Sequence, residues 1–185
     1  MLNRLALVPG SVPERGVHFW EPTVDGVPVR RLLRYDDPED VDLDVEGLGP
    51  AGDNLPVFVR RRPTPWVDDV LALLGERPAA QLDAGRVPLF VCRMCGDLGC
   101  GAITMRVERD AGTVTRRDFR WETGRDDPDD RVVVPGGPFV FDRARHDAEV
   151  QRFVDSEEAE RAALPVPAGS RSVGRRTWRR WWRRG

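Results

Sequence analysis

Residues 87–122 read VPLFVCRMCGDLGCGAITMRVERDAGTVTRRDFRWE, and this stretch predicts three consecutive strands. Val87–Cys92 is an almost unbroken apolar run, as expected of a buried strand. Ala102–Arg109 alternates apolar and polar residues, and a turn at Asp110–Gly112 returns the chain through a partner strand over Thr113–Trp121. The stretch therefore predicts an antiparallel meander with a cysteine- and glycine-rich loop between its first two strands.

Two principal helices are expected on either side of this meander. One begins at Thr64, a good N-cap followed by Pro65 at the first helical position, and it ends at Gly75. The other is capped by Asp142 and runs to about Ala163. Strands followed by a terminal helix, with one helix between strands, predict an α+β fold with a mainly antiparallel sheet.

Weaker signals complete the expected fold. Residues 1–16 contain closely spaced Pro and Gly and are expected to be irregular. Short strands are predicted at Val17–Trp20, Val27–Tyr35 and Leu55–Arg60, and a further one at 139–141. A change of parity among the apolar positions predicts a bulge near Arg116–Asp118.

Composition excludes several classes of function. The chain has 185 residues, all of its 29 basic residues are Arg, and no Lys is present. A phosphate-binding P-loop lysine and a Schiff-base lysine are therefore excluded. No apolar run reaches the ~18–20 residues that cross a bilayer, and Met1–Gly10 lacks the pattern of a signal peptide. We expect a cytoplasmic protein.

The charge is distributed unevenly along the chain. Residues 1–160 contain all 31 acidic residues and 21 Arg, a net charge of −10, whereas residues 161–185 contain 8 Arg and no acid. This asymmetry predicts a single acidic α+β domain over 1–160 and a flexible cationic tail over 161–185.

The three cysteines, Cys92, Cys95 and Cys100, fall within nine residues in a C-x2-C-x4-C pattern. A Cys-x-x-Cys-Gly turn is typical of a zinc knuckle, in which thiolates bind a tetrahedral ion. Three cysteines leave one ligand to be supplied, and Asp97, His146, His18 or water are the candidates. The first interpretation is a binding or structural module that is organised around this loop and holds zinc.

Two other interpretations of the cysteines stay open. In a thiol–disulfide oxidoreductase, Cys92 and Cys95 would cycle through a disulfide, Cys100 would be the resolving thiol, and Arg93 would stabilise a thiolate. No helix is expected after the motif, so activation by a helix dipole is not predicted. In an interaction protein, the cysteines would be inert and would pack the end of the sheet.

The tail provides the contacts in this last interpretation. Three tryptophans lie at i, i+3 and i+4 among arginines, which would place an aromatic face and a cationic face on one helix. Such a segment suits an anionic membrane, nucleic acid or an acidic protein surface. The residues concerned are Arg175, Arg176, Trp178, Arg179, Arg180, Trp181, Trp182, Arg183 and Arg184.

Val87–Glu122, together with Gly137–Phe139 and Phe141–Ala144, resembles a family of uncharacterised actinobacterial proteins. Its members share the strand, the Cys–Gly loop, the hairpin, a Gly-Pro-Phe segment and an Asp-capped helix, and the resemblance covers roughly residues 80–154. Some members carry a generic oxidoreductase label. The resemblance implies that the Cys–Gly loop is a structural unit, and it assigns no catalytic residue.

Overall fold

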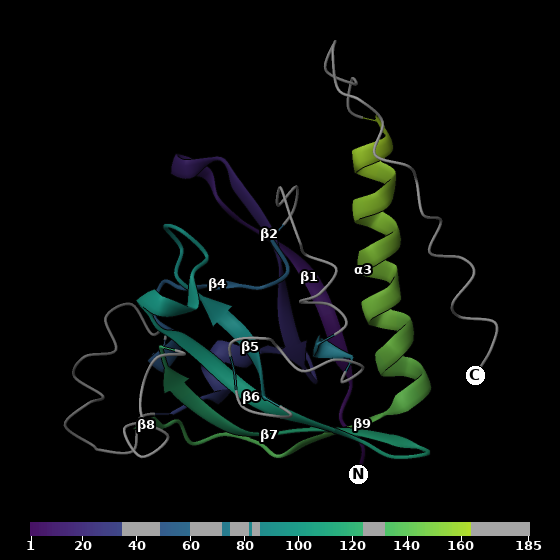
Figure 1. Cartoon of the computed structure of the whole chain (residues 1–185). Helices are drawn as coiled ribbons and strands as arrows, with labels where there is room; N and C mark the ends of the chain where they lie inside the picture. The colour runs from purple at the N-terminus through teal and green to yellow at the C-terminus, as the bar shows by residue number, and fades with distance from the viewer. Residues whose placement is uncertain (35–48, 60–71, 75–81, 83–85, 124–131, 164–185) are drawn as a thin grey trace.

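The computed structural model describes residues 1–34, 49–59, 72–74, 82, 86–123 and 132–163, and it has the predicted α+β fold (Figure 1). A three-stranded antiparallel sheet has the order β1-β2-β3. A six-stranded sheet has the order β4-β5-β6-β7-β8, with β9 also paired to β7. The strands are β1 Leu5–Val12, β2 Val17–Val24, β3 Val27–Pro28, β4 Leu55–Pro56, β5 Arg86–Val91, β6 Ala102–Arg109, β7 Thr113–Glu122, β8 Val132–Val133 and β9 Phe139–Asp142.

The helical elements whose bounds fall within the described residues are short except for one. They are η1 Pro13–Arg15, α1 Val29–Leu32, η4 Gly49–Ala51, η5 Leu98–Cys100 and the 21-residue α3 Arg143–Ala163. No helix in the described ranges is both long and apolar enough to cross a bilayer. The second predicted principal helix, which begins at Thr64, lies largely outside the described residues, and its end at Ala72–Leu74 is buried.

The predicted meander is confirmed as β5, β6 and β7. The predicted bulge is also confirmed, because Thr104 pairs with Arg120 whereas Arg106 pairs with Arg117, which leaves one extra residue in β7. Asp118 lies in that bulge with φ 54°. A second irregularity at Pro88 accommodates a residue that lacks the N–H of a regular ladder.

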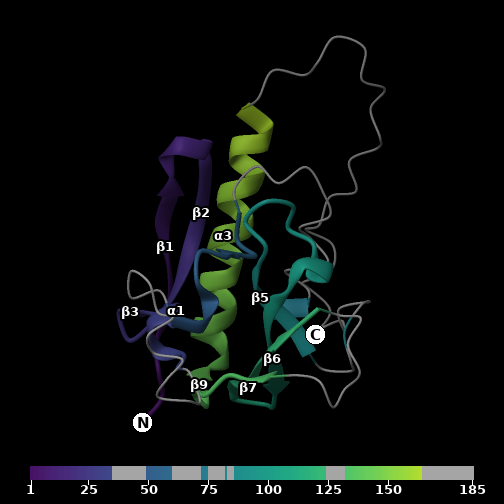
Figure 2. The same ribbon diagram turned by 90° about the vertical axis from the view of Figure 1, so that its left-hand side faces the viewer.

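The helix α3 begins as predicted, because Asp142 Oδ1 accepts a hydrogen bond from the backbone N–H of Arg145 at 2.9 Å. Figures 1 and 2 show this helix alongside the β1–β2 hairpin. Glu149 accepts from Leu7 N, and Arg152 donates to Leu7 O, so side chains of α3 bind the outer edge of β1. Phe153 packs edge-on against Phe58 at 5.1 Å. One apolar core joins both sheets and α3.

Two expectations for the N-terminal region were wrong. Most of residues 1–16 are not irregular, because residues 5–15 form β1 and η1. Pro9 is tolerated there because β1 is an edge strand, and Gly10 is needed because a Cβ would lie 2.5 Å from Phe19 Cε2.

The strand expected over Val27–Tyr35 was also wrong, because it ends at Pro28 and is followed by α1. Proline can precede a helical turn, and this turn buries Val29 and Leu33 four residues apart. Leu55–Arg60 is a shorter strand than predicted, since β4 covers Leu55–Pro56 and Val59 forms a bridge to Phe19. Tyr35 and Arg60 lie outside the described residues.

Candidate metal site

The Cys–Gly loop connects the end of β5 at Val91 to the start of β6 at Ala102. Its first turn is closed by a hydrogen bond from Gly96 N to Cys92 O at 2.8 Å, and Gly96 has φ 69°. The second half is the short helix η5. Asp97 caps it by accepting from Gly99 N at 2.7 Å.

The loop is closed against the sheet at Gly101, which has φ 99°. A Cβ at this position would lie 2.1 Å from Trp121 Cζ2, so the indole ring packs directly on the glycine backbone. Only glycine combines this conformation with this contact. The loop is therefore held by its own backbone and by β7.

This backbone brings the three predicted cysteine ligands together. The Sγ atoms of Cys92, Cys95 and Cys100 all lie within 4.8 Å of one another, close enough to bind one metal ion. Cys95 Sγ and Cys100 Sγ are 3.4 Å apart. Cys92 is half-buried, and Cys95 and Cys100 are exposed, so the three-sulfur group opens to solvent.

The peptide N–H groups of the first turn act on one sulfur in particular. The N–H groups of Cys95 and Met94 point at Cys92 and hold the pKa of its thiol below its usual range. Met94 N lies 3.4 Å from Cys92 Sγ. The hydrogen bond with Cys95, and the negative charge of that residue, raise the pKa of Cys100 to about 11. The loop thus favours the thiolate form of Cys92. It disfavours a thiolate at Cys100 until a cation compensates the negative charge of the group.

The fourth ligand is not supplied by the residues that the sequence suggested. Within the described part of the chain, the group of potential ligand atoms contains the three cysteines alone. Asp97 uses its carboxylate to cap η5. His146 is buried at the start of α3, where it contacts Arg116 and Asp147, and His18 is exposed on β2.

Arg93 forms an ion pair in place of the expected contact with a thiolate. Its Nη1 lies 2.6 Å from Asp53 Oδ2 in an exposed ion pair. The polarising groups at Cys92 are peptide N–H groups and not this guanidinium. Arg15, at the tip of the β1–β2 hairpin, contacts Met94 Sδ and so brings the first sheet to the loop.

For the redox interpretation, all three sulfurs lie close together. Cys95 Sγ and Cys100 Sγ are 3.4 Å apart, and Cys92 Sγ, which would form the predicted disulfide with Cys95, lies within 4.8 Å of both. No long helix begins after the motif, in agreement with the sequence, since η5 has three residues and β6 follows. The tail residues predicted to contact anionic partners, Arg175–Arg184, lie outside the described residues.

Sequence reasoning missed two buried polar networks near the sheet. Arg86, 1% exposed, donates to Glu122, Thr104 and Asp118. Arg116, 2% exposed, donates to His146 Nε2 at 2.9 Å. Arg116 lies on the same face of β7 as the buried Val114, but arginine is so rarely buried that its residue type gives no signal for burial.

Comparison with protein-family models, with curated proteins and with solved structures finds no match for this chain. The resemblance to actinobacterial proteins therefore stays a prediction from sequence, and the chemistry of the three sulfurs is the basis for a function.

Proposed function

We propose that Cys92, Cys95 and Cys100 bind one Zn²⁺ ion and that the protein is a binding or structural module organised around this ion. The observation that carries the proposal is the convergence of the three Sγ atoms within 4.8 Å. Thiolates bound to a tetrahedral zinc ion at about 2.3 Å lie about 3.8 Å from one another. The loop therefore needs only small side-chain movements to accept the ion.

Two further features support a cation at this position. The peptide N–H groups that point at Cys92 stabilise a bound thiolate by hydrogen bonds to sulfur. The raised pKa of Cys100 arises from its neighbour Cys95, and a divalent cation would remove that repulsion. The exposed side of the group leaves room for a fourth ligand such as water.

Metal content of the purified protein tests this proposal. Protein made in zinc-supplemented cells, kept reduced and never exposed to chelators, should contain about one zinc per chain. Cys95→Ser should lose the metal, because the two remaining thiolates have no histidine or carboxylate beside them among the described residues to complete the site. Met94→Leu is the matched control, since Met94 lies in the same turn, is 69% exposed and carries a neutral thioether in place of a thiolate. Metal-free wild-type protein would overturn the proposal.

Thiol–disulfide exchange is the second candidate, and the lowered pKa of Cys92 favours it. A functional thiol of this kind should react with iodoacetamide at pH values below ~8.5, which is the pKa of free cysteine. The two candidates separate when zinc is added, because a structural site should protect all three cysteines from alkylation. Alkylation of Cys92 only at alkaline pH in metal-free protein would exclude an activated thiol.

A further inference from the structure

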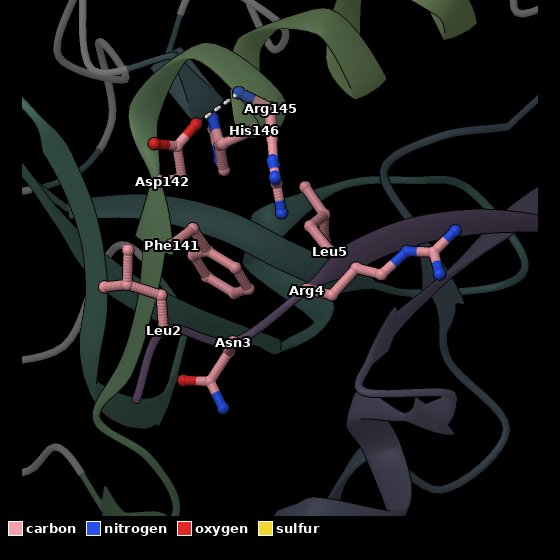
Figure 3. A pocket seen from close by; sticks show the side chains of 8 residues that line it. All are labelled: Leu2, Asn3, Arg4, Leu5, Phe141, Asp142, Arg145 and His146. Carbon is pink, nitrogen blue, oxygen red and sulfur yellow. Dashed lines mark hydrogen bonds between the residues drawn. The ribbon is translucent and has the colours of Figure 1, made fainter.

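We propose that a cavity at the start of α3, separate from the Cys–Gly loop, binds a small organic carboxylate. The cavity has a volume of about 250 Å³. It lies where the N-terminal residues run beside β9 and the first turn of the helix (Figure 3). Its lining residues are Leu2, Asn3, Arg4, Leu5, Phe141, Asp142, Arg145 and His146.

The charged residues of the lining are two arginines, Arg4 and Arg145, and one carboxylate, Asp142. Arg145 extends from the first turn of α3 toward Leu5 and Phe141, whereas the guanidinium of Arg4 points away from them (Figure 3). Neither arginine forms an ion pair with any residue in the described ranges. Among the described lining residues, Asp142 is the one carboxylate, and its Oδ1 accepts the capping hydrogen bond of the helix. Arg145 is therefore available to an external anion.

A buried cation behind the cavity wall adds to this positive potential. Arg116 is 2% exposed, lies 5.6 Å over the Phe141 ring and donates to His146 Nε2. Its Nε has no hydrogen-bond partner, and no carboxylate in the described part of the chain forms an ion pair with it. A buried guanidinium without an anion is costly, so a nearby negative charge would be stabilised.

The imidazole of His146, which lies between Arg116 and the cavity, is neutral. Because a guanidinium can only donate, His146 accepts at Nε2 and carries its proton on Nδ1, which donates to Asp147 at 3.0 Å. Asp147 is in turn neutralised by Arg109 through bonds of 3.0 and 2.6 Å. No carboxylate among the described residues pairs with Arg116, and its contacts with His146 and Phe141 place its charge directly behind two lining residues of the cavity.

The apolar part of the lining sets the class of ligand. Leu2, Leu5 and the Phe141 ring offer hydrocarbon contact beside the cation. The volume lies below the ~300–1,000 Å³ of pockets for drug-sized molecules, so a compact ligand fits. A carboxylate on a short aliphatic or aromatic group matches both parts, with its oxygens at the guanidinium of Arg145.

Titration of the full chain with sodium benzoate, followed by amide chemical shifts, tests the proposal. Benzoate should bind with a Kd that is roughly millimolar, and the largest shifts should lie at residues 2–5 and 141–146. Benzamide, which keeps the ring and lacks the charge, should bind more weakly by at least about tenfold. Inorganic phosphate at the same ionic strength should also bind more weakly, since it gains no apolar contact.

Two arginine variants make the test specific. Arg145→Gln should weaken benzoate binding by at least about tenfold. Arg143→Gln is the matched control, because Arg143 lies on the same turn, is similarly exposed and does not line the cavity. Unchanged melting of both variants would show that the fold is intact. Equal benzoate affinity in wild type and Arg145→Gln, shifts centred elsewhere, or tighter binding of phosphate than of benzoate would each overturn the proposal.

Discussion

At the scale of single residues, the protein buries two guanidinium groups in different ways. Arg86 reaches Glu122 at 2.9 Å and Asp118 at 2.8 Å, so its charge is balanced inside the sheet. Arg116 has a neutral imidazole as its hydrogen-bond acceptor. Burial and the nearby charge of Arg116 lower the pKa of His146 to about 3. His146 must therefore stay neutral for this part of the core to form.

This requirement predicts acid-sensitive stability. In the unfolded chain His146 protonates near pH 6.5, whereas in the folded state it does so near 3. Because the folded pKa is depressed, the stabilising effect is present above pH 6.5 and is lost as pH falls toward 3. The free energy of unfolding should decrease by about 2 kcal/mol between pH 7 and pH 5. Urea denaturation at the two pH values measures it.

The second histidine provides the control for this experiment. His18 is exposed on β2, so His18→Gln should keep the pH dependence. His146→Gln retains an acceptor for Arg116 and should remove most of the pH dependence of stability. Equal slopes in the two variants would show that His146 does not account for the effect.

Another residue-scale prediction concerns Gly101, which closes the Cys–Gly loop. Gly101→Ala should lower the free energy of unfolding by about 2 kcal/mol, because φ is 99° and a Cβ would meet Trp121. Gly112→Ala is the control, since a Cβ there would have no other atom within 4 Å. Equal urea midpoints for the two variants would show that packing of the Trp121 indole on Gly101 does not stabilise the Cys–Gly loop.

At the scale of elements, α3 packs against both sheets and so stabilises their association. Its side chains bind the edge of β1 at Leu7, and its inner face places Val150 and Phe153 in the core. Phe153 is 2% exposed and packs on Phe58, which precedes the bridge from Val59 to β2. The helix thus buries residues of both sheets.

Truncation of Phe153 measures that contribution. Phe153→Ala should lower the free energy of unfolding by about 3–5 kcal/mol, as expected of a large side chain removed from a packed core. Glu158→Ala, on an exposed position of the same helix, should change it by less than about 0.5 kcal/mol. A loss below 1 kcal/mol for Phe153→Ala would mean that α3 is only loosely docked.

The elements that the sequence predicted well are those with strong local signals. Periodic apolar residues and a turn predicted β5, β6 and β7, and the Asp142 cap predicted the start of α3. The strand β1 was missed because Pro9 and Gly10 read as breakers, whereas the edge position and the ring of Phe19 make them suitable.

The same contrast holds for the candidate site. The cysteine spacing predicted which sulfurs converge, because the loop is local and its glycines permit sharp turns. Arg93 forms an ion pair with Asp53, and His146 accepts a hydrogen bond from Arg116. In each pair the two residues are distant in sequence. Only tertiary packing determines such contacts, so spacing could not identify them.

At the scale of the whole molecule, residues 1–160 carry a net charge of −10 and residues 161–185 carry +8. The sequence predicts that deleting residues 165–185 leaves the melting temperature unchanged, because the linker after Leu164 has no periodic apolar residues to pack. Any affinity for anionic vesicles or nucleic acid should disappear with the tail. A truncated protein that melts several degrees lower would show that the tail belongs to the fold.

We propose that three sulfurs of one loop bind a single zinc ion. X-ray absorption at the zinc edge of the metal-loaded protein tests this most directly, because it reports the number and type of ligands. We predict three sulfur atoms at about 2.3 Å and one lighter ligand at about 2.0–2.1 Å. A spectrum with two sulfurs or fewer, or with four, would contradict the claim.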